Sequence, residues 1–246
     1  MLGIIGGVGP RATARLYLGL TSRCAAQAGG TLPALLVHSV PMTRAIEDAY
    51  LAGHAGVRSS ARAAARAMLA DAVAGLVRGG AELLMMPCNT LQGDLRSLCA
   101  EQRVEHLDLL DATAEAIANA GARRVLILGT TTTFRTDAYG PRLRRHGIDG
   151  FYPSEREQAL VEAQIRDALD LRPSPRNRLL ELVNTHAREC DAVLLACTDL
   201  SRDMLAELDA VAVFDSLECL SVAAARRVAS AAVQPGAREC EVHDGG

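Results

Sequence analysis

Two of the seven cysteines lie where a reactive thiol would be useful. Cys88 and Cys197 each follow a short apolar run, so each is predicted to stand at the carboxyl end of a strand, near the start of a helix. Ligands of open α/β sheets bind outside these strand ends. A helix N-terminus carries partial positive charge, which lowers the pKa of a thiol and raises its thiolate fraction. Two such thiols facing one cleft would form an acid/base pair.

The other cysteines suggest no chemistry of their own. Seven is an odd number and no Cys-x-x-Cys pair occurs, which argues against a disulfide framework and favours reduced thiols. A free cysteine is most often a small apolar core residue. We assign that structural role to five of them: Cys24, Cys99, Cys190, Cys219 and Cys240.

The composition excludes several other chemistries. All 26 basic residues are Arg, and a chain without Lys forms no pyridoxal phosphate aldimine, no Schiff base of an aldolase and no Walker phosphate loop. The six His residues lack metal-ligand spacing and no Gly-x-Ser-x-Gly elbow occurs, so we expect neither a metal site nor a hydrolase triad. A net charge of −3 with 3% aromatic residues predicts no nucleic-acid partner.

The sequence shows no sign of export or membrane insertion. Its first residues lack a basic segment followed by a long apolar run, and no stretch reaches the roughly 18 apolar residues of a membrane span. We therefore expect a cytoplasmic protein with no membrane partner.

Short apolar runs alternate with longer segments of helical spacing, a pattern typical of β-α-β units with a parallel sheet. The predicted strands are Leu2–Ile5, Ala34–Val40, Leu83–Met86, Glu105–Leu107, Val125–Leu128, Val193–Ala196 and Ala212–Phe214. The predicted helices are Pro10–Ser22, Val57–Arg78, Thr113–Ala120, Ser154–Leu169, Pro175–Glu189 and Leu217–Ala232. The sequence therefore predicts a doubly wound α/β architecture.

The chain also resembles itself. Leu2–Gly7 is similar to Val125–Thr130, and Glu82–Thr90 is similar to Asp191–Asp199, so the two strand-end cysteines occupy equivalent positions. This weak repeat predicts two similar parallel-sheet domains related by a pseudo-two-fold duplication, with the active site in the cleft between them.

The length allows this division. A chain of 246 residues, 49% of them hydrophobic, is long enough for two domains that each bury a core. We place the first domain at residues 1–104 together with a returning C-terminal helix at about 216–246, and the second domain at residues 105–215.

Several motifs together resemble the aspartate/glutamate racemase family in order and spacing. They are Gly3-Ile4-Ile5-Gly6-Gly7-Val8-Gly9-Pro10 with Thr13, Pro87-Cys88-Asn89-Thr90, Leu128-Gly129-Thr130 with Thr133 and Tyr139, and Cys197-Thr198-Asp199. The match extends over nearly the whole chain, and the combination is specific although each motif alone is weak.

The resemblance implies an isomerase: a cofactor-independent amino-acid racemase in which each of two domains supplies one cysteine. Carried over to this chain, Cys88 and Cys197 are the two bases on opposite faces of the substrate Cα. The thiolate of one removes the α-proton, and the thiol of the other reprotonates the carbon from the far side. A small amino-acid substrate, no cofactor and a homodimer are further implications.

Without an imine as electron sink, an amino-acid α-hydrogen is only weakly acidic. Preorganised donors must therefore stabilise an enolate-like carboxylate. Candidate donors at the predicted turns are Asn89, Thr90, Thr130, Thr133 and Thr198. Thr and Asn are also preferred helix N-caps, so these side chains can serve the fold, the substrate or both.

The glycine-rich turn Gly6–Pro10 follows the first predicted strand. It does not meet the Gly-x-Gly-x-x-Gly spacing of a dinucleotide site and has no Walker Lys, which disfavours nucleotide binding. We consider Gly9 a candidate for close backbone approach to a substrate carboxylate, and a tight turn alone is the alternative.

Departures from the family pattern leave the substrate open. Acidic-substrate members tend to carry Pro-Asp-Arg-Thr after the second strand, whereas this chain has Pro41-Met42-Thr43-Arg44, so its Arg stands one position further along. A family Lys expected after the helix ending near Leu169 is missing, and Arg172 lies nearby. Arg forms a two-pronged bond with carboxylates, which makes Arg44 and Arg172 candidates for contacting the substrate. Aspartate, glutamate or another amino acid is the expected substrate.

Two further departures concern the cysteine motifs. The family commonly has Ala-His after Pro-Cys-Asn-Thr, where this chain has Leu91-Gln92, and commonly has Glu where Asp199 stands. Two other functions therefore stay open. One is a Cys-dependent decarboxylase or cis-trans isomerase of a dicarboxylic acid, although such an enzyme needs only one cysteine. The other is a non-catalytic amino-acid sensor.

Overall fold

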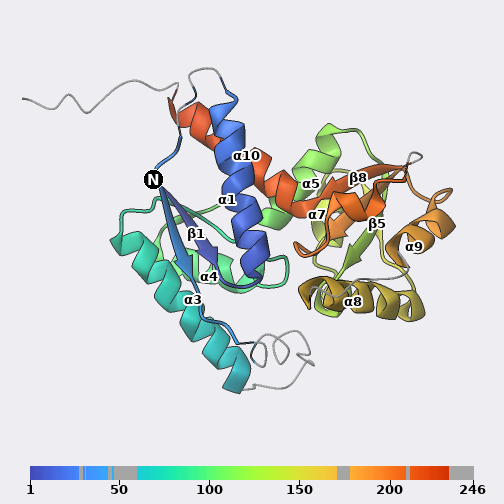
Figure 1. Ribbon diagram of the computed structural model, residues 1–246, viewed down its shortest axis with the longest axis horizontal. Helices are drawn as coiled ribbons and strands as arrows, with labels where there is room; N and C mark the ends of the chain where they lie inside the picture. Colours follow the sequence, from blue (N-terminus) through green and yellow to red (C-terminus); the bar gives the residue numbers. More distant parts are fainter. Residues whose placement is uncertain are drawn as a thin grey trace, which may run out of the picture.

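The computed structural model describes residues 1–27, 30, 32–43, 46, 60–170, 178–208 and 211–232. Within these ranges the chain forms two parallel sheets of four strands each (Figure 1). The first sheet contains β1 (Leu2–Gly6), β2 (Leu35–Ser39), β3 (Leu83–Met85) and β4 (Glu105–His106). The second contains β5 (Arg124–Gly129), β6 (Asp149–Phe151), β7 (Ala192–Ala196) and β8 (Ala212–Asp215).

The two sheets have the same strand order. It is β2-β1-β3-β4 in the first and β6-β5-β7-β8 in the second, and every strand pair is parallel. β3 and β7 thus hold equivalent places, each next to the first strand of its half. The predicted fold class, two similar doubly wound α/β halves, is confirmed.

Helices cover both sheets. They are α1 (Pro10–Ala25), α3 (Ser60–Arg78), α4 (Gln92–Gln102), α5 (Leu109–Asn119), α6 (Thr131–Arg135), α7 (Gly140–Arg145), α8 (Glu155–Leu169), α9 (Arg178–His186), the 3₁₀ helix η1 (Arg202–Leu205) and α10 (Ser216–Ala232). Among the helices of the described ranges, none is both long and apolar enough to cross a membrane.

The strongest predicted strands are buried apolar runs. All residues of β1, β3 and β7 are buried, as expected for central strands of a parallel sheet that is covered on both faces. The sequence did not predict β6, because Asp149–Phe151 is short, partly exposed and interrupted by Gly150. A Cβ at Gly150 would lie 2.6 Å from the Leu143 side chain, so this strand needs a glycine there to pack against α7.

Helix caps explain where two helices begin. α1 starts at Pro10 after Gly9, whose φ of 75° suits glycine. α5 starts four residues before the predicted Thr113, because Asp108 accepts hydrogen bonds from the backbone N–H groups of Leu110 and Asp111. The predicted residues 57–59 and 175–177 of two other helices lie outside the described residues.

Helix α4 was not predicted at all. Its sequence QGDLRSLCAEQ contains a glycine and several charged residues, and only part of one face is apolar. That face packs against α3. Leu95, Leu98 and Cys99 are buried there, in the same apolar cluster as Leu69 and Val73. Tertiary packing therefore stabilises a helix whose own sequence signal is weak.

Among the described residues, one of three buried apolar clusters contains residues of both halves. α10 packs against both α1 and α5, and Figure 1 shows it running from β8 towards α1. Leu16 and Leu20 of α1 lie in the same buried cluster as Leu217 and Leu220 of α10, together with Ile127 of β5. The last helix therefore joins the first half to the second.

The domain division stays a proposal, with one adjustment. The sequence placed the boundary between residues 104 and 105, but β4 (Glu105–His106) pairs in parallel with β3 of the first sheet. A boundary at residue 104 would separate this strand from its sheet. We therefore propose that the division falls after His106.

Candidate active site

The two strand-end cysteines line one cavity between the two halves. Cys88 lies three residues beyond β3 and Cys197 directly follows β7, so equivalent strands carry them. The cavity opens to solvent on one side. Its lining residues are Val8, Met42, Cys88, Asn89, Thr90, Leu91, Thr130, Ile165, Leu169, Cys197, Thr198 and Asp199.

The loop that carries Cys88 is held by the fully buried Gln92. Its side-chain Nε2 donates to the backbone carbonyls of Met86 at 3.0 Å and Cys88 at 2.7 Å. Its Oε1 accepts from the backbone N–H of Leu109 at 3.3 Å. This glutamine stands where the family commonly has His, and here it fixes the backbone of the thiol-bearing loop.

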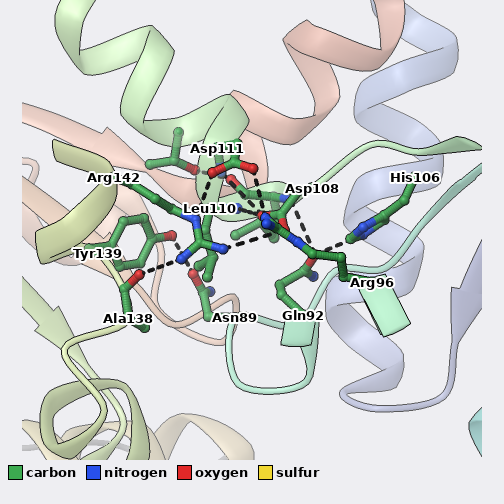
Figure 2. A network of polar contacts seen from close by, with 12 residues as sticks. Asn89, Gln92, Arg96, His106, Asp108, Leu110, Asp111, Ala138, Tyr139 and Arg142 are labelled. Atoms are coloured by element: carbon green, nitrogen blue, oxygen red, sulfur yellow. Dashed lines mark hydrogen bonds and ion pairs between the residues drawn. The ribbon is translucent and has the colours of Figure 1, made fainter. Parts of the chain in front are cut away.

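The side chain of Asn89 is bonded to the protein on both sides. The Tyr139 hydroxyl donates to its Oδ1, as Figure 2 shows, and its Nδ2 donates to Ser216 Oγ at 3.1 Å. Asn89 is 4% exposed and Tyr139 is fully buried, and burial holds the pKa of Tyr139 well above its usual value. Asn89 therefore ties the Cys88 loop to the second half and to α10, instead of serving only as a substrate donor.

A charged network supports the turn that carries Tyr139 (Figure 2). Arg96 of α4 bonds Asp108, and Arg142 of α7 bonds both Asp111, at 2.7 Å, and the carbonyl of Ala138, at 2.8 Å. Burial alone would raise the pKa of Asp108, but the hydrogen bonds from Arg96 and the charge of Arg142 outweigh it and lower that pKa. The network links α4, α5 and α7 next to the cavity.

The loop that carries Cys197 is held from the other half of the molecule. Arg15 of α1 donates to the carbonyls of Thr198 at 3.0 Å and Leu200 at 3.3 Å, and its Nη2 bonds Asp215 at 2.8 Å. The Thr198 hydroxyl donates to the carbonyl of Pro87 at 3.0 Å, which joins the two cysteine loops directly.

The environment of Cys197 differs from the sequence prediction. Cys197 is 7% exposed, and burial raises its pKa well above the usual thiol value; the neighbouring charge of Asp199 and the thiol of Cys88 raise it further. Hydrogen bonds with the backbone of Asp199 and Leu200 lower it by less. The helix N-terminus that the sequence predicted at Cys197 is missing, because a turn and the short η1 follow β7. The helix that follows Cys88, α4, begins four residues later, at Gln92. The predicted lowering of the thiol pKa is therefore wrong for Cys197.

The threonines form a small hydroxyl chain. Thr130 Oγ1 lies 3.3 Å from Thr90 Oγ1 and 3.0 Å from Thr133 Oγ1. Thr130 also caps α6 by accepting from the backbone N–H of Thr133. Thr90 and Thr130 line the cavity, whereas Thr133 is 1% exposed and lies behind Thr130. Thr130 thus combines a capping role with a place at the cavity.

Of the remaining predicted site residues Gly9, Arg44 and Arg172, the structure describes Gly9. Gly9 caps α1, and both carboxylate oxygens of Asp199 lie 3.6 Å from the position that a Cβ on Gly9 would take. The glycine turn of the first half therefore meets the second cysteine loop. Arg44 and Arg172 lie outside the described residues.

In the part of the chain that the structure describes, no group of three His, Cys, Asp or Glu side chains is placed to hold a metal ion.

The sequence matches the Asp/Glu/Hydantoin racemase family over residues 5–224. The chain belongs to this family. Membership makes it an isomerase of the amino-acid racemase type. A curated relative, the broad specificity amino-acid racemase RacX of Bacillus subtilis, is 23% identical over 229 residues, which cover 90% of this chain and 95% of the relative.

Solved structures of the racemase family share the fold. An aspartate racemase homologue from Pyrococcus horikoshii matches with a TM-score of 0.70 and 25% identity, over 95% of this chain and 99% of the other. The aspartate racemase of Picrophilus torridus matches with a TM-score of 0.70 and 25% identity, over 93% and 94%. The two-sheet architecture of this chain is therefore that of the racemase family.

Several residues at this racemase-family site were not singled out from sequence. Arg15 and Gln92 had no assigned role, and Tyr139 appeared only within a motif. The apolar lining residues Met42, Ile165 and Leu169 were not predicted either. The departure from the family at Gln92 was a usable signal, but Arg15 lies on a helix face whose neighbours only the fold reveals.

Proposed function

We propose that the protein racemises an amino acid without a cofactor, using Cys88 and Cys197 as the two bases. The observation that carries the proposal is the cavity itself: two thiols from equivalent strand ends of the two sheets line the same space. A substrate bound between them would have one thiol on each face of its Cα.

The proposed reaction balances with these two groups alone. The thiolate of one cysteine takes the α-proton and becomes a thiol, and the substrate becomes an enolate-like carbanion. The thiol of the other cysteine then donates its proton to the opposite face and becomes a thiolate. Proton exchange with water resets the pair, so the product is the enantiomer and nothing else is consumed.

The lining supplies groups that suit this intermediate. Thr90 and Thr130 line the cavity and their hydroxyls are held 3.3 Å apart, so they are oriented before the substrate binds, whereas the Thr198 hydroxyl already donates its proton to the Pro87 carbonyl. Asp199 provides a carboxylate for the substrate ammonium group. Contacts from Gly9, Asn89, Thr133, Arg44 and Arg172 to the substrate, a homodimer and a cytoplasmic location stay predictions.

Exchange of the α-hydrogen in D₂O tests the proposal. With the full chain, both enantiomers of a substrate should lose their Cα–H signal in proton NMR, and each should give the other by chiral chromatography. Cys88→Ala and Cys197→Ala should each abolish racemisation, because each removes one base. Cys190→Ala is the matched control: this thiol is also partly exposed, but it is not part of the cavity lining.

Racemisation at the wild-type rate in either cavity variant would refute the two-thiol mechanism. Formation of a decarboxylated or isomerised product would instead support a lyase or cis-trans isomerase, and stoichiometric binding of an amino acid without exchange would support a sensor.

A further inference from the structure

The cavity lining consists of two chemically different groups of residues. The polar group, formed by Thr90, Thr130, Thr198 and Asp199, comes from the turns after β3, β5 and β7. The apolar group contains Val8 and Leu91, beside the turns after β1 and β3, together with Met42 after β2 and Ile165 and Leu169 of α8. An amino acid also has two chemically different parts, a charged α-centre and a side chain.

The apolar group is built from both halves of the molecule. Met42 follows β2 of the first half and is partly buried against the apolar core of that half. Ile165 and Leu169 lie four residues apart on α8 of the second half, so their side chains share one helix face. Ile165 is 2% exposed, and Leu169 is partly exposed at the last residue of the helix.

The polar group already contains a negative charge. Asp199 lines the cavity, and every amino acid brings an ammonium group that this carboxylate can pair with. A substrate side chain with a carboxylate would place a charged group against Met42 and Leu169. A neutral aliphatic side chain avoids this penalty.

We propose that the preferred substrates are neutral amino acids with an aliphatic or thioether side chain, such as leucine or methionine, whose side chain packs on Met42, Ile165 and Leu169. This inference rests on the proposed racemase function. It predicts that chain length controls turnover, because one methylene in an apolar pocket changes kcat/KM by about tenfold or more.

A substrate panel tests the inference directly. The full-length wild-type protein is assayed in D₂O with L-leucine, L-methionine, L-alanine, L-aspartate, L-glutamate and L-lysine. Leucine and methionine should exchange with kcat/KM at least about tenfold above alanine and above both acidic amino acids. Faster exchange of aspartate, glutamate or lysine overturns the inference and leaves the racemase proposal intact. Exchange of none of them refutes the racemase proposal, and the inference with it.

Two cavity variants locate the side-chain contact. Leu169→Ala and Met42→Ala should lower kcat/KM for leucine by about tenfold while that for alanine stays within about twofold, because alanine does not reach these residues. Unchanged turnover of alanine also shows that the variants are folded. The matched control is Leu160→Ala on the same helix, where Leu160 is 44% exposed and should affect neither substrate.

An unchanged leucine-to-alanine ratio in both cavity variants overturns the inference. So does preferred exchange of aspartate that Arg44→Ala or Arg172→Ala abolishes, because pairing with an acidic side chain would then decide the substrate.

Discussion

The two cysteine loops occupy equivalent places in a duplicated architecture, yet they are held by unlike means. The Cys88 loop is fixed by a residue of its own segment, since Gln92 bonds the carbonyls of Met86 and Cys88. The Cys197 loop is fixed across the molecule by Arg15, which lies 183 residues before Thr198. The two halves therefore place their thiols at equivalent strand ends but surround them differently.

This divergence matters for the proposed chemistry. Cys88 is partly exposed, whereas Cys197 is buried with a raised pKa. A raised pKa keeps a thiol protonated at neutral pH. Under the proposed function, we therefore assign Cys197 the role of proton donor in the resting protein.

The largest expected effect is that of Arg15→Ala. The change leaves Asp215, 1% exposed, without its ion-pair partner and frees two carbonyls of the Cys197 loop. Because the Arg15 side chain is itself 37% exposed, we expect a loss of about 2 kcal/mol of unfolding free energy, below the range for a fully buried pair. Urea unfolding followed by circular dichroism measures it.

The control for this variant is Arg23→Ala on the same helix. Within the described residues the Arg23 guanidinium bonds a carbonyl of α1 at 3.5 Å, so its loss should change the unfolding free energy little. Equal stability of the two variants would contradict the role assigned to Arg15. Racemisation should also fall in Arg15→Ala and stay unchanged in Arg23→Ala.

The next effect is a difference in thiol reactivity. Iodoacetamide attacks the thiolate, and each unit by which a pKa is raised lowers the thiolate fraction about tenfold below that pKa. Burial, which raises the pKa of Cys197, also shields it. We expect Cys88 to be alkylated at least about tenfold faster than Cys197 at pH 8. The rate at Cys197 should keep rising with pH beyond the range of an ordinary thiol.

Mass spectrometry of the two cysteine peptides over time measures both rates. Arg15→Ala should speed alkylation of Cys197 alone, because it loosens that loop. Faster labelling of Cys197 than of Cys88 in the wild type would contradict the lower reactivity expected for the buried thiol.

A smaller effect is expected for Tyr139→Phe. The change keeps the ring and removes the donor to Asn89 Oδ1, which then lies in a buried site with an unpaired oxygen. We expect a loss of about 1–2 kcal/mol. The Cys88 loop should be affected more than the Cys197 loop, so alkylation of Cys88 should change first. Tyr17→Phe, at a residue 44% exposed on α1, is the matched control and should leave stability and labelling as they are.

Sequence patterns predicted the fold where burial produces a clear signal. The wholly apolar runs of β1 and β7 and the helix Glu155–Leu169, which has a capping box at Ser154 and Glu157, stood close to their predicted bounds. β6 and α4 were missed because their sequences are mixed, and packing against Leu143 or α3 stabilises them instead. Packing between segments that are distant in the sequence leaves no pattern in the local sequence.

In the candidate site, too, sequence motifs predicted some residues, and tertiary contacts determine the roles of others. Motif positions brought Cys88, Thr90 and Cys197 to one cavity, because strand ends follow from the chain order of a parallel sheet. The roles of Arg15 and Tyr139 depend on contacts between distant segments, and no local pattern predicts these. The pKa of Cys197 followed burial, whereas the sequence argument relied on a helix that does not form there.

The smallest expected effect concerns the bond that joins the two loops. Thr198→Val removes the hydroxyl that donates to the Pro87 carbonyl at 3.0 Å, at a residue 4% exposed, and we expect a loss of about 1 kcal/mol. Thr198→Ser keeps the hydroxyl and should retain the hydrogen bond to Pro87, although it removes the methyl group. Comparing the two variants therefore separates the effect of the hydrogen bond from the effect of side-chain packing. If the loops act as one unit, Thr198→Val should raise alkylation of both cysteines and Thr198→Ser of neither. A change confined to Cys197 would show instead that each loop is held independently, by Gln92 on one side and Arg15 on the other.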